Sequence, residues 1–168
     1  MITGSKKVFF TQRDILVDLF VKNGFHAEQR AIIVSLTGYP DYLSARLEKI
    51  LKETPDLPVF YLHDSAPEGQ IMASQMNYSK YSLTQHPIID LGLFPSDVKL
   101  MKIKGLKYMR PSKSAYEIPV DYLRFETLAT ALTVALAQKT PLGALLAKSE
   151  TDHDGFAAEE LAFFSDFG

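Results

Sequence analysis

The sequence predicts an α/β domain in which a mostly parallel sheet is flanked by helices, with extra C-terminal helices. Short β-branched and aromatic runs, such as 31–36 and 59–62, are typical of strands buried on both faces. Turn residues and a stretch with helical periodicity follow each run, and such alternation favours crossover connections between parallel strands. Because 168 residues are enough for one core, we treat residues 1–168 as a single domain.

The first two strand–helix pairs are marked by their caps. A strand at 7–10 precedes a helix for which Thr11 is the expected N-cap. The strand at 31–36 precedes an amphipathic helix that Asp41 is expected to cap. Gly24 is placed to end the first of these helices, so that the second strand can begin soon afterwards.

The third strand, at 59–62, is followed by a capping box of Ser65 and Glu68, with Pro67 in the first helical turn. The remaining elements have weaker signals. We expect short strands at 80–83 and 88–91, a short helix from Pro95 to Met101, a loop at 102–114, a long helix from Pro119 to about Lys139 ended by Pro141, and a last helix at 157–164.

Composition excludes several classes of protein. The chain has no cysteine, which rules out disulfides and thiolate metal sites. No apolar run is long enough to cross a bilayer, and the N-terminus does not resemble a secretory signal. We therefore predict a cytoplasmic protein with no membrane partner.

Charge is uneven along the chain, although the formal net charge is only −2. Residues 99–113 contain six basic side chains and no acid, whereas residues 150–168 contain six acids and no Lys or Arg. The basic stretch either contacts a phosphate backbone or is a solvated loop that acidic residues neutralise. The candidate nucleic-acid contacts are Lys102, Lys104, Lys107 and Arg110.

The loops that follow the second and third strands form the candidate ligand-binding edge, because parallel sheets bind ligands at the carboxyl ends of their strands. Helix starts at this edge also aim backbone donors at it, which suits an anion. His63 and Asp64 are neighbours and point to opposite faces of a strand, so we interpret His63 as structural. The residues of these loops are Gly38, Tyr39, Asp41, His63, Asp64 and Gly69.

These loops resemble the Toprim domain of the family formed by the topoisomerase VI A subunit and its meiotic relative, which cuts DNA to start recombination. The matching motifs are TGYPD at 37–41, with Arg46 in the next helix, and PVFYLHDSAPEG at 58–69. A looser match continues through IDLGL at 89–93 and PSD at 95–97. The resemblance implies a Toprim-like core at about 6–101, followed by the basic loop at 102–114 and a C-terminal helical extension at 119–168.

In that family a Glu after the first strand and two acids after a later strand hold Mg²⁺. The resemblance places these ligands on Thr11 or Gln12, on Asp64 and on Ala66, so only Asp64 supplies a carboxylate. Glu68 is better interpreted as a capping residue. Because Mg²⁺ needs several hard oxygen ligands, we expect no cofactor and only a weak metal site at Asp64; Mg²⁺ is the expected cofactor if the protein is active.

The family cuts DNA with a tyrosine from a separate winged-helix domain that precedes the Toprim part. No tyrosine in this sequence matches that nucleophile. Tyr39 and Tyr42 lie nearest the predicted edge, and we interpret them as packing and hydrogen-bonding residues.

Three functions remain compatible with the sequence. The favoured one is a degenerate, non-catalytic Toprim-like protein that binds DNA or a protein partner in a DNA-processing system. The second is a metal-dependent phosphoryl-transfer enzyme, a nuclease or topoisomerase-like protein, using Asp64 and Glu68 with Asp14 or Asp41 as a third acid. The third is a nucleotide or small-molecule binding domain that shares only the sheet edge.

Overall fold

The computed structural model describes residues 7–66, 81, 83, 85–100 and 119–149. They form two compact units. The described part of the first unit comprises residues 7–63, 81, 83 and 85–90, and that of the second comprises 64–66, 91–100 and 119–149. Whether the chain behaves as one domain stays a prediction.

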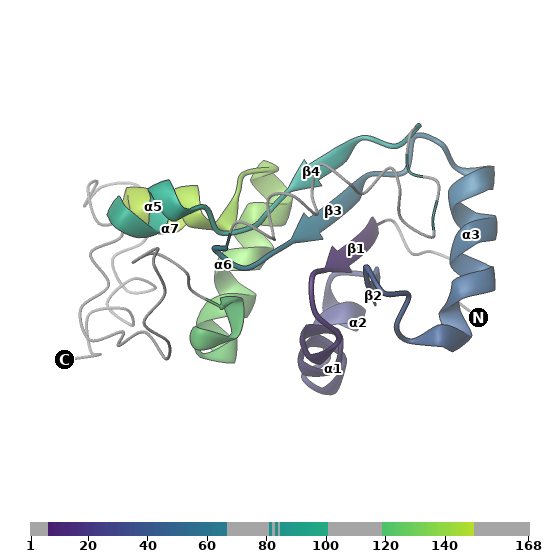
Figure 1. Ribbon diagram of the computed structural model, residues 1–168, viewed down its shortest axis with the longest axis horizontal. Helices are drawn as coiled ribbons and strands as arrows, with labels where there is room; N and C mark the ends of the chain where they lie inside the picture. Colours follow the sequence, from purple (N-terminus) through teal and green to yellow (C-terminus); the bar gives the residue numbers. More distant parts are fainter. Residues whose placement is uncertain (1–6, 67–80, 82, 84, 101–118, 150–168) are drawn as a thin grey trace. The chain divides into compact units, whose positions relative to one another are not determined.

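A four-stranded parallel sheet is the centre of the first unit (Figure 1). The strand order is β2-β1-β3-β4, and all three pairings are parallel. The strands are β1 (Lys7–Thr11), β2 (Ala31–Ser35), β3 (Val59–Leu62) and β4 (Ile88–Asp90). Strands that follow one another in the chain run the same way, so crossover connections join them, and the predicted α/β class is confirmed.

One face of the sheet is covered by α1 (Asp14–Lys22) and α2 (Phe25–Glu28). Phe9 of β1 meets Phe20 and Phe25 edge-on, with ring centroids 5.7 and 6.3 Å apart. Gly24, with φ of 76°, makes the turn between the two helices, a conformation that favours glycine. The short helix α2 has no counterpart among the predicted elements.

The opposite face is covered by α3 (Ser44–Glu53), which follows the 3₁₀ turn η1 (Asp41–Leu43). Alternate residues of β1 point to this side, and Phe10 packs in one buried cluster with Leu47 and Leu51 of α3. Figure 1 shows α3 and the α1–α2 pair on different sides of the strands. Both faces of the sheet are therefore buried, which explains why the strand sequences are continuous apolar runs.

The regular elements described in the second unit are helical, although Ser65 forms an isolated β-bridge. Its elements are α5 (Pro95–Leu100), η3 (Val120–Tyr122), α6 (Phe125–Gln138) and α7 (Leu142–Ser149). Helix α7 packs against both α5 and α6. Leu128, Leu132 and Leu136 recur every four residues on α6 and are buried.

Several predicted boundaries were wrong. Thr11 belongs to β1, and Arg13 is the N-cap of α1. Asp41 begins η1, and the N-cap of α3 is Leu43, which makes no side-chain capping bond. The helix expected from Pro119 is divided into η3 and α6, and α7 was not expected beyond Pro141.

Other predicted elements cannot be compared in full. Of the strand expected at 80–83, Tyr81 and Leu83 are described; both are buried and neither lies in a strand. The helix after Pro67, the loop at 102–114 and the helix at 157–164 lie outside the described residues. Within the described ranges, no helix has the length and hydrophobicity to cross a membrane.

Candidate functional site

The loop after β2 is held in one conformation by its own hydrogen bonds. The amide of Ser35 donates to the carbonyl of Tyr39 at 2.8 Å, and the amide of Gly38 donates to the carbonyl of Ser35 at 3.0 Å. Gly38 has φ of 95°, which L-side chains rarely adopt, and the peptide bond between Tyr39 and Pro40 is cis. The TGYPD motif is therefore a compact turn at the carboxyl end of β2.

Two acids of α1 fasten this turn. The hydroxyl of Thr37 donates to Oδ1 of Asp14 at 2.7 Å, and the phenol of Tyr39 donates to Oδ1 of Asp18 at 2.8 Å. The hydrogen bond to Asp18, followed by the charge of that carboxylate, raises the pKa of Tyr39. Asp14, the candidate third acid, thus already binds a neighbouring loop, and Tyr39 is held in its neutral, less nucleophilic form.

The position that the resemblance assigns to the first acid carries a hydroxyl. Thr11 is fully buried, and its Oγ1 donates to the carbonyl of Arg13 at 3.0 Å. Its backbone carbonyl accepts from the amide of Leu36 at 3.0 Å. Thr11 therefore serves the turn between β1 and α1, and it offers no anionic ligand.

His63 is paired with an acid that the sequence did not single out. The ring is fully buried, and its Nε2 lies 3.1 Å from Oδ1 and 3.2 Å from Oδ2 of Asp90. The ring of Tyr61 lies 5.3 Å away. Tyr61 and Asp90 are register partners on β3 and β4, so same-face spacing would have pointed to this pair once the strand order was known.

The resemblance places one of the family ligands on Asp64, and the side chain of this residue is engaged within the second unit. Its Oδ1 accepts a hydrogen bond of 2.7 Å from the amide of Val120. Asp64 is 9% exposed and Val120 is fully buried. Asp64 and Val120 are 56 residues apart in the sequence, so local sequence patterns could not predict this contact.

The other predicted site residues are not brought into a cluster that the structure describes. Asp41 is exposed at the start of η1. Among the described residues, no group of three or more His, Cys, Asp or Glu side chains is arranged to hold a metal ion. The following residues lie outside the described ranges: Glu68, Gly69, Lys102, Lys104, Lys107 and Arg110.

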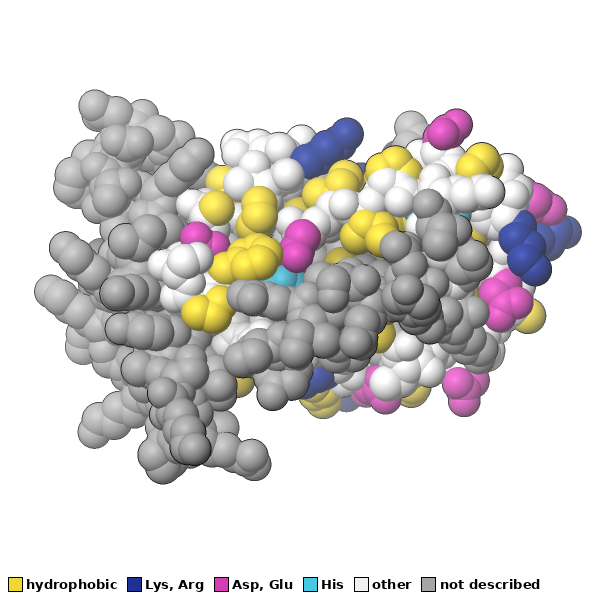
Figure 2. Space-filling view, turned by 45° about the horizontal axis from the view of Figure 1, so that its top comes forward, with side chains coloured by type: hydrophobic (Ala, Val, Ile, Leu, Met, Phe, Trp, Pro, Cys, Tyr) yellow, Lys and Arg dark blue, Asp and Glu magenta, His cyan; other side chains and the backbone are white. Residues whose placement is uncertain are grey.

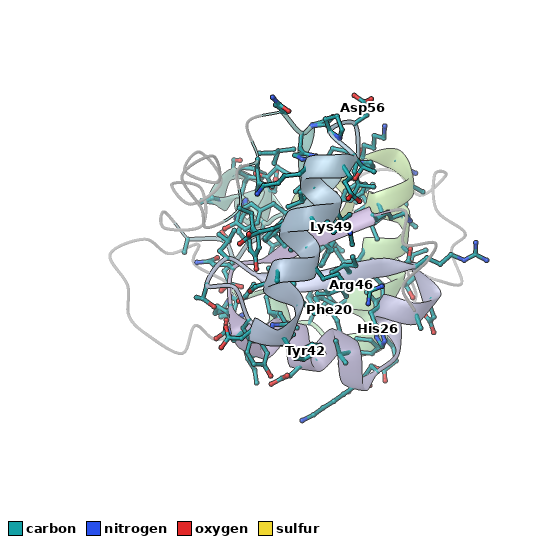
Figure 3. The ribbon with its side chains drawn as sticks, turned by 90° about the vertical axis from the view of Figure 1, so that its right-hand side faces the viewer. Phe20, His26, Tyr42, Arg46, Lys49 and Asp56 are labelled. Carbon is teal, nitrogen blue, oxygen red and sulfur yellow. The ribbon has the colours of Figure 1, made fainter. Side chains whose placement is uncertain are left out.

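The outer face of α3 carries charges of both signs. Figure 3 shows Arg46 and Lys49 along this helix, with Tyr42 and Asp56 toward its two ends. Lys49 lies 3.8 Å from Glu53 in an exposed i,i+4 ion pair. Figure 2 likewise shows basic side chains beside acidic ones at the right, where α3 lies in Figure 1. Such a face does not form a continuous basic surface.

The parallel sheet, the glycine turn after β2 and the loop after β3 together define a Toprim-type α/β protein. The chain belongs to the Toprim-domain family of the topoisomerase 6 A-subunit and Spo11, whose model matches residues 8–143. The match extends beyond the end of the Toprim-like core expected at about 6–101, and it includes α6.

Meiotic recombination proteins are among the relatives. The chain is 31% identical over 111 residues to the meiotic recombination protein SPO11 of Mus musculus, and 30% identical to that of Homo sapiens. It is 27% identical over 110 residues to the meiotic recombination protein SPO11-1 of Arabidopsis thaliana. Each match covers 61% of this chain but only 28–30% of the relative, so the chain aligns with less than a third of those proteins. No solved structure is a significant match.

Proposed function

We propose that this chain is a degenerate Toprim protein without metal-dependent catalysis of its own, which binds DNA or a protein partner in a DNA-processing system. The observation that carries the proposal is the position of Asp64 and the hydrogen bond that its side chain accepts. This residue is the one acid left at the three family positions, and it is bonded to the amide of Val120. This carboxylate alone supplies too few oxygen ligands for a tight Mg²⁺ site.

Ligand chemistry supports this proposal. Mg²⁺ prefers octahedral oxygen coordination and is held in phosphoryl-transfer sites by carboxylates together with substrate phosphates. Thr11 and Ala66 replace two of the three acids, and the hydroxyl of Thr11 is already bonded to Arg13. The total Coulomb attraction of the site for a divalent ion is therefore smaller than it would be with three carboxylates.

The two tyrosines nearest the sheet edge, Tyr39 and Tyr42, give no support to the alternative of an active DNA-cutting enzyme. Nucleophilic attack needs a phenol that loses its proton, and a raised pKa opposes that loss. The bond to Asp18 raises the pKa of Tyr39. Tyr42 is 81% exposed, and among the described residues no basic group is hydrogen-bonded to its hydroxyl.

A cleavage and binding assay with duplex DNA tests the proposal. We expect Mg²⁺ not to strengthen binding relative to EDTA, because cations compete for the DNA phosphates, and we expect no metal-dependent cleavage. Asp64→Asn should leave DNA binding unchanged. Cleavage that requires Mg²⁺ or Mn²⁺ and disappears in Asp64→Asn would establish the phosphoryl-transfer alternative. A thermal shift with nucleotides but not with DNA would instead favour a nucleotide-binding domain.

The basic segment 99–113 provides the test for DNA as the partner. Each phosphate contact contributes about 0.9 to the slope of log K against log salt concentration. Replacing Lys104 and Lys107 by Ala should therefore weaken duplex binding and lower this slope by up to about 2. Replacing Lys49 and Lys52 of α3 by Ala removes the same charge from the mixed face and should change the slope little.

Equal effects of the two double variants would show that net charge alone governs binding. Absence of DNA binding in the wild type would leave a protein as the partner. In both experiments each variant must have the same melting temperature as the wild type when no DNA is present, because unfolding would also reduce the bound fraction.

A further inference from the structure

Two helical elements of the second unit, η3 and α7, begin at oxygen atoms supplied by the chain just beyond the strands. The amide of Val120, at the start of η3, donates to Oδ1 of Asp64, which lies two residues after the end of β3. At the start of α7, the amide of Leu142 donates to the carbonyl of Leu91 at 3.0 Å, immediately after β4. The amide of the next residue donates to the carbonyl of Gly92 at 3.4 Å.

These donors belong to groups that need partners. The first amides of a helical turn have no acceptor within the turn, and a buried amide without an acceptor is costly. Val120 is fully buried, and Asp64 is 9% exposed. No side chain caps η3 from its own N-cap residue, so Asp64 supplies the cap from a distant part of the sequence.

We propose that Asp64 is a latch that fastens the start of the helical segment 119–149 to the chain leaving β3. The latch is a structural self-contact: the amide of Val120 donates to Oδ1 of the carboxylate, and this bond holds the start of η3 beside Asp64. The proposal depends on the hydrogen bond and the burial of its partners. It does not depend on DNA binding or on the absence of catalysis.

The latch has a local consequence for dynamics. Proteins open in cooperative parts, and an amide that relies on one long-range acceptor exchanges its proton when that part opens. Loss of the Asp64 carboxylate therefore releases η3 first and weakens the adjoining α6. The strands β1, β2 and β3 belong to the first unit and keep their protection.

Hydrogen exchange on the full chain tests the latch by comparing three variants with the wild type. Asp64→Ala removes the acceptor, and Asp64→Asn keeps an acceptor oxygen but removes the charge. Asp56→Ala, at an exposed acid in the turn before β3, is the control. A hydrogen bond to a charged group is worth enough to change the opening equilibrium about ten- to a hundredfold.

The expected result is exchange at the amide of Val120 about ten- to a hundredfold faster in Asp64→Ala and a smaller increase in Asp64→Asn. The amides of β1 and the Asp56→Ala control should keep wild-type rates. An unchanged rate at Val120 in Asp64→Ala would overturn the latch. So would equal acceleration in the Asn and Ala variants, because the acceptor would then be irrelevant.

If Asp64→Ala does not fold, the exchange rate of Val120 in Asp64→Asn tests the latch instead. Exchange at Val120 that is faster than in the wild type, but by less than about a hundredfold, supports the latch; an unchanged rate, or acceleration beyond about a hundredfold, overturns it. These outcomes are independent of the proposed function, which the cleavage, binding and metal titrations test separately. A latch that fails in a protein without cleavage leaves the proposed function intact.

Discussion

The phenol of Tyr39 donates a hydrogen bond to Oδ1 of Asp18 at 2.8 Å and so joins the turn after β2 to helix α1. The carboxylate stabilises the neutral phenol and opposes the negative charge of the phenolate, so both effects raise the pKa of Tyr39. The turn that carries the family motif is thereby anchored by a proton that stays in place at neutral pH.

Asp18→Asn should lower the pKa of Tyr39 toward its ordinary value, since an amide removes the repulsion of the phenolate. Absorbance near the tyrosinate band measures the ionisation, but the chain has eight tyrosines. The signal of Tyr39 is therefore taken as the difference between each protein and the same protein with Tyr39→Phe. An unchanged or higher pKa in Asp18→Asn would show that Asp18 does not control the phenol.

Gly143→Ala should destabilise the protein by about 1–3 kcal/mol through overpacking between α5 and α7. A Cβ atom on Gly143 would lie 2.8 Å from Oδ2 and 2.9 Å from Cβ of Asp97, and the Cβ cannot swing away as a side-chain tip can. In a helix without this contact, the same change is favourable by about 0.5–1 kcal/mol, so the sign identifies the effect that dominates. Denaturant unfolding gives the free energies.

A double-mutant cycle provides the control for this prediction. Asp97→Gly removes the atoms that a new methyl group would meet. In that background, Gly143→Ala should cost little or become stabilising. An equal cost in both backgrounds would show that Asp97 is not the obstacle.

Burial raises the pKa of Asp97, which gives the stability a pH dependence of known sign. The folded state holds this proton more tightly than the unfolded state, so the resulting stabilisation is complete below the unfolded-state pKa. It is lost as the pH rises through the higher folded-state pKa. Asp97→Asn has no such proton.

The free energy of unfolding of the wild type, relative to Asp97→Asn, should therefore rise as the pH falls through the window between those two pKa values. Denaturant titrations at a series of pH values measure the difference. A relative loss of stability of the wild type on acidification would mean that the folded state favours the charged carboxylate instead.

Local patterns predicted the parts of this protein that local physics determines. The run Ile32-Ile33-Val34 indicated a strand buried on both faces, and it lies in β2 as expected. Leu47 and Leu51 marked the buried side of α3. The end of the first strand was missed because Thr11 fits a strand as well as a cap, and the pairing of β1 with β3 extends to it.

The second unit was harder to predict because its features depend on distant contacts. Pro141 was interpreted as the end of one helix, but it also directly precedes α7, a position that proline tolerates. The donor from Val120 to Asp64 and the approach of Gly143 to Asp97 join segments far apart in sequence. Periodicity and capping rules contain no information about which of many amides or glycines a given carboxylate will meet.

Direct measurement of Mn²⁺ binding tests the central claim. According to that claim, a site that keeps only one of the three family carboxylates offers too few ligands to hold a divalent ion. Isothermal titration of the wild type should reveal no saturable site at sub-millimolar Mn²⁺, whereas Ala66→Asp, which restores the second acid, should bind more tightly than the wild type. A stoichiometric site in the wild type that disappears in Asp64→Asn would contradict the account.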